Sequence, residues 1–245
     1  MKVLWLLVLG LPCFAAVCSE TDFLGTYGFQ LSGTTTISGV ETPIASIGRL
    51  VLEADGKMSG VSSVNFNGLF LGNPVTGTYK IQTDCSVTWG LQDDSGAWQR
   101  FAGSAEPGGA SVQFHQTDPG TVNTRGVFER TPADCGAQAF QGRYALSITG
   151  RGTPYKTSGA PGRLSADGTA EADGAGNLAL TWSGGKTSGT YSVDSDCTVQ
   201  LEFGIAPDQD SSDLVKLRGI LVNGGKEVLA VQTDPERVAV AKLVR

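Results

Sequence analysis

The tetrapeptide Gln-Thr-Asp-Pro occurs twice in this chain of 245 residues, beginning at Gln116 and again at Gln232, 116 positions later. Other landmarks recur in the same order: a cysteine seven positions before a Gly-x-Tyr, a Glu-Ala-Asp-Gly, a Gly-Thr-Tyr followed by Asp-Cys, and a Gly-Gly pair. An ordered set of repeats at a nearly constant offset indicates a duplicated structural unit. We therefore expect two related domains, residues 18–132 and 133–245, behind a short leader.

The leader, residues 1–17, has one early lysine, then an apolar run from Val3 to about Leu11, then Pro12 and small residues. This layout is typical of a secretory signal peptide, and the run is too short for a membrane-spanning helix of about 20 residues. We expect a secreted or periplasmic protein without a transmembrane segment. Lipid attachment at Cys18 is an alternative, but Val17 stands where lipoprotein signals carry a small residue.

Four cysteines follow the leader, two in equivalent places of each unit. An even number of cysteines in an exported chain indicates disulfides, and four cysteines allow three pairings. The symmetry of the repeat selects Cys18–Cys85 and Cys135–Cys197. Closing loops of this length is expected to stabilise each domain by roughly 4 kcal/mol. Neither a Cys-x-x-Cys nor a histidine pair accompanies the cysteines, so we expect no metal site.

Within each unit, apolar residues alternate with polar ones, as in Thr198–Phe203 and Tyr27–Leu31. This period of two predicts strands with one buried face. In the first unit, strand-like runs lie near 24–33, 44–54, 57–65, 76–82, 86–92, 97–104, 110–117 and 121–130. We therefore predict an all-β protein of two tandem antiparallel eight-stranded barrels, with β-sandwiches as the alternative. The Gln-Thr-Asp-Pro string then falls at the corner between the seventh and eighth strands of each unit.

The cysteine before Gly25-Thr26-Tyr27, together with the later Asp84-Cys85 turn, resembles a group of small secreted bacterial β-barrel proteins. In strand count and size, both units are also similar to calycin and allene oxide cyclase-type barrels. The calycin resemblance implies a cavity for an apolar ligand, or in some members a cyclase activity. Tyr27 stands where lipocalins carry tryptophan, and no catalytic residue is carried over by the resemblance.

Six aromatic residues fall on the apolar face of first-unit strands, and we take them as candidate ligand-binding residues, with a filled core as the alternative. They are Tyr27, Phe29, Tyr79, Trp89, Phe101 and Phe114. The single histidine, His115, is expected on the solvent side of its strand. No Gly-x-Ser-x-Gly elbow occurs, so a serine hydrolase is not indicated, and no catalytic residue or cofactor is expected.

The net charge of −6 without a basic cluster argues against nucleic-acid binding. These observations favour an exported binding protein, whose partner is a small apolar molecule or an envelope or extracellular protein. A non-hydrolytic enzyme of the cyclase or isomerase type and a structural or adhesive envelope module are the alternatives. A binding protein is favoured over an enzyme because the sequence shows no cluster of catalytic residues.

Overall fold

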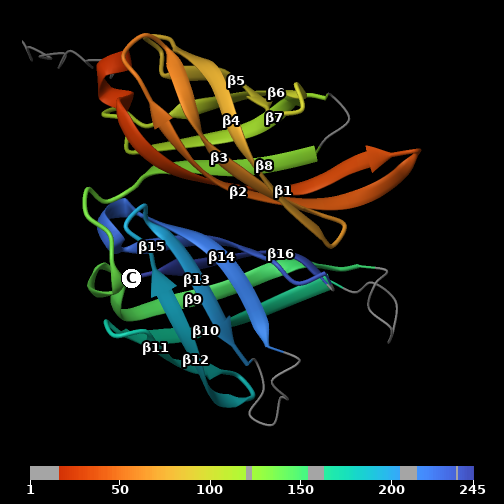
Figure 1. The fold of residues 1–245 in the computed structure, drawn as a ribbon, viewed down its shortest axis with the longest axis vertical. Helices are drawn as coiled ribbons and strands as arrows, with labels where there is room; N and C mark the ends of the chain where they lie inside the picture. Colours follow the sequence, from red (N-terminus) through yellow and green to blue (C-terminus); the bar gives the residue numbers. More distant parts are fainter. Residues whose placement is uncertain (1–16, 120–122, 154–162, 205–213, 236) are drawn as a thin grey trace, which may run out of the picture.

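The computed structural model describes residues 17–119, 123–153, 163–204, 214–235 and 237–245. It contains two closed antiparallel barrels of eight strands each, the first above the second in Figure 1. The prediction of tandem barrels is confirmed, and the sandwich alternative is wrong. Almost all of the expected signal peptide lies outside the described residues. None of the described helices has the length and apolarity that a membrane-crossing helix needs.

Each strand pairs with the next one, and the last strand of each barrel pairs with the first. The first barrel consists of β1 (Gly25–Ile37), β2 (Val40–Leu52), β3 (Lys57–Phe66), β4 (Leu69–Ile81), β5 (Ser86–Asp93), β6 (Trp98–Ala105), β7 (Ser111–Asp118) and β8 (Asn123–Arg130). The second consists of β9 (Gln141–Gly152), β10 (Arg163–Asp173), β11 (Asn177–Trp182), β12 (Gly185–Val193), β13 (Thr198–Phe203), β14 (Val215–Val222), β15 (Glu227–Gln232) and β16 (Arg237–Val244).

The first two strands are longer than the sequence pattern indicates. The alternation of apolar residues fades after residue 33, yet β1 continues through a run of three threonines to Ile37. Threonine suits an extended backbone even where one face is not buried. The hairpin turns only at Ser38 and Gly39, both of which have positive φ. The Gln-Thr-Asp-Pro strings begin inside the strands and lead into the connections: Gln116 to Asp118 end β7, and Gln232 ends β15.

One end of each barrel is closed by a disulfide and a 3-10 turn. The bridges are Cys18–Cys85 and Cys135–Cys197, the pairing that the repeat symmetry predicts. The turns η1 (Glu20–Phe23) and η2 (Ala137–Ala139) precede the first strand of each barrel, and Phe23 is buried at the first of these ends. Because the sulfur of Cys18 is bonded to Cys85, it is not available to carry a thioether-linked lipid.

The two barrels pack through the outer faces of β1 and β2 against those of β14, β15 and β16. Ile47 on β2 belongs to the same buried cluster as Leu229 and Val231 on β15. The contact is close at Gly28, where an added Cβ would lie 2.7 Å from Ile220 Cγ2 and 2.8 Å from Val222 Cγ1. The interface and the interior of the second barrel therefore form one continuous apolar core.

Two carboxamide side chains of the first barrel reach into the seam between β15 and β16. Gln30 Nε2 donates to the carbonyl oxygens of Ala230 (2.7 Å) and Ala241 (2.9 Å). Asn65 Nδ2 donates to those of Gln232 (2.7 Å) and Arg237 (2.9 Å). Each amide nitrogen thus spans one carbonyl on each strand, and together they join the barrels by polar contacts of defined geometry.

A buried acidic pair lies where β8 approaches the second barrel. Glu129 is 9% exposed. Burial, followed by the carboxylate of Glu227, raises its pKa from 4.5 to about 7, and the charge of Glu106 adds to this. Lys242, which forms an ion pair with Glu227, opposes the shift. Glu129 therefore holds its proton in the folded protein to a higher pH than a free glutamate does.

Gly28→Val is expected to destabilise the protein by about 1–3 kcal/mol, because the added methyl groups overlap Ile220 and Val222 and force the barrels apart. Urea unfolding followed by circular dichroism measures this. The matched control is Ala145→Val: Ala145 holds the corresponding position of β9, but it is exposed. Equal effects of the two substitutions would show that the barrels do not depend on this close contact.

Glu129→Gln is expected to stabilise the protein at pH 8 and to have little effect at pH 4. The pKa of Glu129 is higher in the folded state than in the unfolded state. The free energy of unfolding is therefore unaffected below about pH 4.5, where both states are protonated, and it falls as the pH rises to about 7. Removing the ionisable group should restore of order 1–3 kcal/mol above pH 7. Urea midpoints of wild type and variant at the two pH values test this, with exposed Glu171→Gln as control. A pH-independent difference would contradict the assignment.

Candidate functional site

The first barrel opens into a cavity at the end opposite η1. The cavity has a volume of about 60 Å³ and is lined by residues from the middle of β1 and β2, near the ends of β3, β5 and β7, and near the starts of β4 and β6. Its apolar lining includes Phe29, Leu31, Leu91 and Phe101. The cavity is about twice the volume that a water molecule occupies in the liquid, which admits a small group rather than a whole drug-sized ligand.

Polar side chains share the lining of this cavity. Ser46, Ser62, Asn73, Gln99 and Gln116 bring hydroxyl and carboxamide groups to it. The Ser46 hydroxyl donates to the carbonyl of Ser63 (3.0 Å), and Gln116 Nε2 donates to the carbonyl of Asp118 (3.1 Å). A group that enters the cavity thus meets aromatic and aliphatic surface together with neutral hydrogen-bonding groups.

The acid in the lining, Asp93, holds a turn together. Its Oδ1 accepts hydrogen bonds from the hydroxyl of Ser95 (2.6 Å) and from the backbone N–H groups of Ser95 and Ala97 (both 3.0 Å). The hydroxyl of Ser95 is the main cause that holds the Asp93 pKa below its usual value, with the backbone bonds adding to it. A carboxylate with this pKa stays ionised at neutral pH, so it is a poor general acid.

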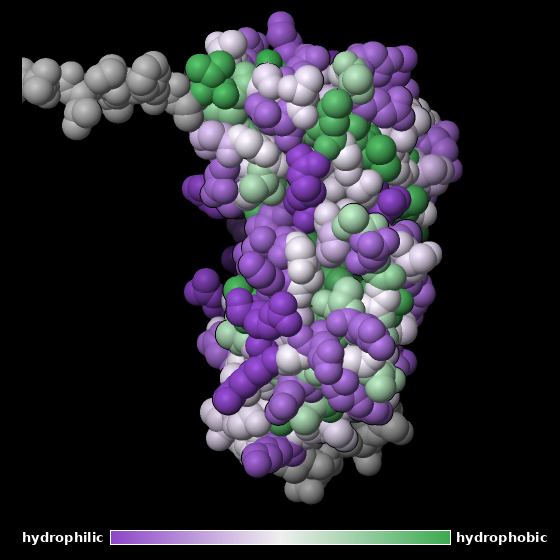
Figure 2. All heavy atoms as spheres, turned by 90° about the vertical axis from the view of Figure 1, so that its left-hand side faces the viewer, coloured by the Kyte–Doolittle hydropathy of each residue, from purple (hydrophilic) through white to green (hydrophobic). Residues whose placement is uncertain are grey.

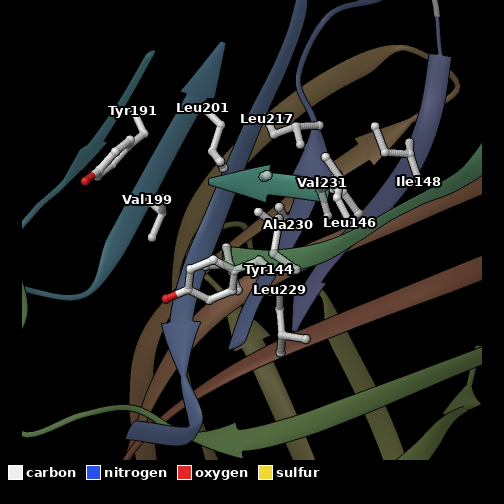
Figure 3. Packing of buried hydrophobic residues seen from close by; sticks show 14 of the residues in the cluster. Tyr144, Leu146, Ile148, Tyr191, Val199, Leu201, Leu217, Leu229, Ala230 and Val231 are labelled. Atoms are coloured by element: carbon white, nitrogen blue, oxygen red, sulfur yellow. The ribbon is translucent and has the colours of Figure 1, made fainter. Parts of the chain in front are cut away.

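The second barrel fills the corresponding space with a large side chain. Ser62 pairs with Gly48 across β2 and β3, and Trp182 pairs with Gly168 across β10 and β11, so the two residues hold equivalent positions. The indole of Trp182 lies 5.9 Å from the ring of Phe203, centroid to centroid. Elsewhere in this barrel, inward side chains such as Tyr144, Leu146, Val199 and Leu201 fill the interior (Figure 3). A serine in place of tryptophan therefore accounts for the cavity in the first barrel.

The six aromatic residues predicted from the sequence are all buried, as expected for inward-facing positions. Most of them pack against other rings. Tyr27 stacks on Phe128 with centroids 4.7 Å apart, and Trp89 stacks on Phe101 at 5.2 Å and meets the ring of Phe114 edge-on at 4.8 Å. The Tyr79 hydroxyl donates to the carbonyl of Glu53 (2.7 Å). The rings thus form a packed core over much of the barrel's length.

Of these six residues, Phe29 and Phe101 line the cavity. Ligand binding by them remains a prediction. Sequence reasoning missed the polar residues of the lining, although one of them follows the pattern: Gln116 continues the inward series of Val112 and Phe114 on β7. A polar residue at an inward position of a strand was the available signal.

His115 lies on the exposed outer face of β7, as predicted, and it borders a notch between β7 and β8. The described residues contain no group of three histidine, cysteine, aspartate or glutamate side chains that could hold a metal ion.

Comparison with known proteins leaves the chain without a family. No family model matches it, and no curated protein matches it. Among solved structures, a DUF3598-family protein of unknown function from Nostoc punctiforme is similar at 11% identity, covering 91% of this chain and 96% of that one, with a TM-score of 0.25. A porin-like protein from Bacteroides uniformis is similar at 11% identity, covering 88% and 95%, with a TM-score of 0.21. Scores this low carry no argument about fold or function, and the resemblance to calycins and allene oxide cyclases is not confirmed.

Proposed function

We propose that the protein is an exported binding protein whose first barrel takes the short apolar end of a small amphipathic molecule at its open mouth. The observation that carries the proposal is the cavity beside Ser62, with its mixed apolar and neutral polar lining. Ligand sites typically combine an apolar lining with a few polar groups that fix orientation. The two disulfides are consistent with an oxidising compartment outside the cytoplasm.

The surface around the mouth offers a place for the rest of such a ligand. Leu71 lines the cavity and is 46% exposed, and Leu69, two residues before it on β4, is 56% exposed. Exposed leucines next to a cavity extend its apolar surface beyond the volume that is enclosed. Figure 2 shows the other end of the molecule, the left-hand side of Figure 1 that lies away from the mouth, and this face is largely hydrophilic with small separate hydrophobic patches.

The second barrel has a different part in this proposal. Its mouth-end position is filled by Trp182, and its outer face supports the first barrel through β14 to β16. A filled barrel that buries its neighbour's outer strands suits a scaffold. We therefore assign ligand binding to the first barrel and support to the second.

A homologous series of n-alcohols, from ethanol to hexanol, tests the cavity. Each added methylene should tighten binding about fourfold, the equivalent of about 0.8 kcal/mol of burial, until the cavity is full. Beyond that length the gain per methylene should fall. Titrations followed by ¹H–¹⁵N spectra of the full chain measure affinity, and the largest shifts are expected at the amides of Phe101 and Gln116.

Ser62→Trp should fill the cavity, because it introduces the residue that occupies the equivalent position in the second barrel. It should abolish alcohol binding while the protein stays folded. Val61→Trp is the control, because Val61 is the preceding residue on β3 and faces outward, 45% exposed. If Ser62→Trp binds the alcohols as wild type does, the mouth of the first barrel is not the binding site.

A further inference from the structure

The seam between β15 and β16 of the second barrel binds two carboxamide side chains of the first barrel. Gln30 and Asn65 enter it from the first barrel, and each amide nitrogen spans a carbonyl of β15 and a carbonyl of β16. Because the acceptors are backbone carbonyls, the ability of the seam to bind a carboxamide depends on the separation of the two strands rather than on particular side chains.

The first barrel has the same seam between β7 and β8. The pair Phe114–Gly126 holds the position of Ala230–Ala241, and it is the last pair of its ladder. Beyond it the strands separate, and the N–H of Gln116 donates to the side-chain hydroxyl of Thr124 (3.1 Å). A notch of about 360 Å³ lies here on the outer surface, lined by residues of both strands.

The rims of the two seams differ in polarity. In the second barrel the outward residues beside the seam are Leu229, Val231, Val238 and Val240, which pack into the core shared with the first barrel. In the first barrel the outward residues are Gln113, His115, Asn123 and Arg125, and all four are exposed. The first seam therefore keeps the strand pair that holds Gln30 in the second, although its ladder ends one pair earlier, and its rim is suited to a polar occupant.

We propose that the notch between β7 and β8 binds a primary carboxamide, whose two N–H donors span the carbonyls of Phe114 and Gly126 as Gln30 spans those of Ala230 and Ala241. The amide belongs to an asparagine or glutamine side chain or to a small free amide. The site is on the outside of the barrel, and Gln116 is the residue that lines both this notch and the mouth cavity.

A second copy of this chain does not supply the amide through its equivalent face. The outer face of β9 and β10 corresponds to that of β1 and β2, and the pair Gln30–Ile47 is matched there by Ser147–Asp167. Serine and aspartate bring neither the carboxamide nor the apolar contact that joins the two barrels. The β9–β10 face of a second copy is therefore not the occupant.

The α-N-methylamide of N-acetylglutamine, an uncharged glutaminamide whose single primary carboxamide is its side chain, tests the site in the full chain. Titration followed by ¹H–¹⁵N spectra should shift the amides of Phe114, Gln116 and Gly126. The matched probe is the same compound with its side-chain amide nitrogen dimethylated, and it should bind at least fivefold more weakly because it has lost both side-chain donors. Equal affinities, or shifts elsewhere only, would overturn the proposal.

Two variants separate the seam from the surrounding surface. His115→Trp places a large ring on the rim and should weaken the glutaminamide at least fivefold. Thr88→Trp adds the same ring to an exposed outward position of β5, two strands away from the notch, and should leave the affinity unchanged. Equal effects of the two substitutions would count against binding in the seam.

An extended heptapeptide with one central glutamine then identifies the source of the amide. Binding at least tenfold tighter than the free probe, with shifts that extend along β8, supports a polypeptide occupant. Equal affinity supports a small molecule with the same amide chemistry. Failure of both probes to bind contradicts the carboxamide site.

Discussion

The arrangement of the two barrels depends on two carboxamides that enter a strand seam. Gln30 and Asn65 each donate to two backbone carbonyls of the second barrel. Removing either amide would lose two hydrogen bonds to backbone carbonyls at the interface. The apolar contacts around Ile47 bury surface but depend little on the relative orientation of the barrels. The four hydrogen bonds are directional, so they fix how one barrel is oriented on the other. In this orientation Gly28 lies so close to Ile220 and Val222 that a side chain there would overlap them.

The duplication produced two units that use opposite faces. The first barrel offers the outer surface of β1 and β2, and the second offers that of β14 to β16. This contact is head-to-tail, because it joins two different faces of the repeated unit. Each barrel therefore still carries the face that the other barrel uses in the contact, and a contact of this kind can in principle be repeated. Polar residues occupy the two faces that this contact leaves unused: His115 stands where the second barrel has Val231, and Asp167 stands where the first has Ile47. Divergence of a few outward residues is enough to remove the apolar contact from these faces.

The sequence could predict the strands, the barrels and the disulfides because each leaves a local or repeated signal. Alternation identified the inward face, and it placed Tyr27 and Trp89 correctly. The cavity left no such signal, since Ser62 lies among other small polar residues and becomes informative only when the register matches it with Trp182. Gln30 presents the same difficulty: on an alternating strand it looks like an ordinary solvent-facing residue. Contacts between distant outer faces arise from tertiary packing and are not encoded in the period of either strand.

The shared core has a consequence for the order in which the chain is made. Leu229 and Val231 on β15 are fully buried, and Ile47 of the first barrel belongs to the same cluster. Without the first barrel, the second barrel would expose these residues to solvent as an apolar surface. The first barrel, in contrast, has all its strands once residue 130 has been synthesised, and among the described residues its core cluster includes none beyond that point. Because N-terminal domains fold first during synthesis, the outer face of β1 and β2 can already be formed when the second barrel folds, so the apolar face of β15 need not stay exposed to solvent.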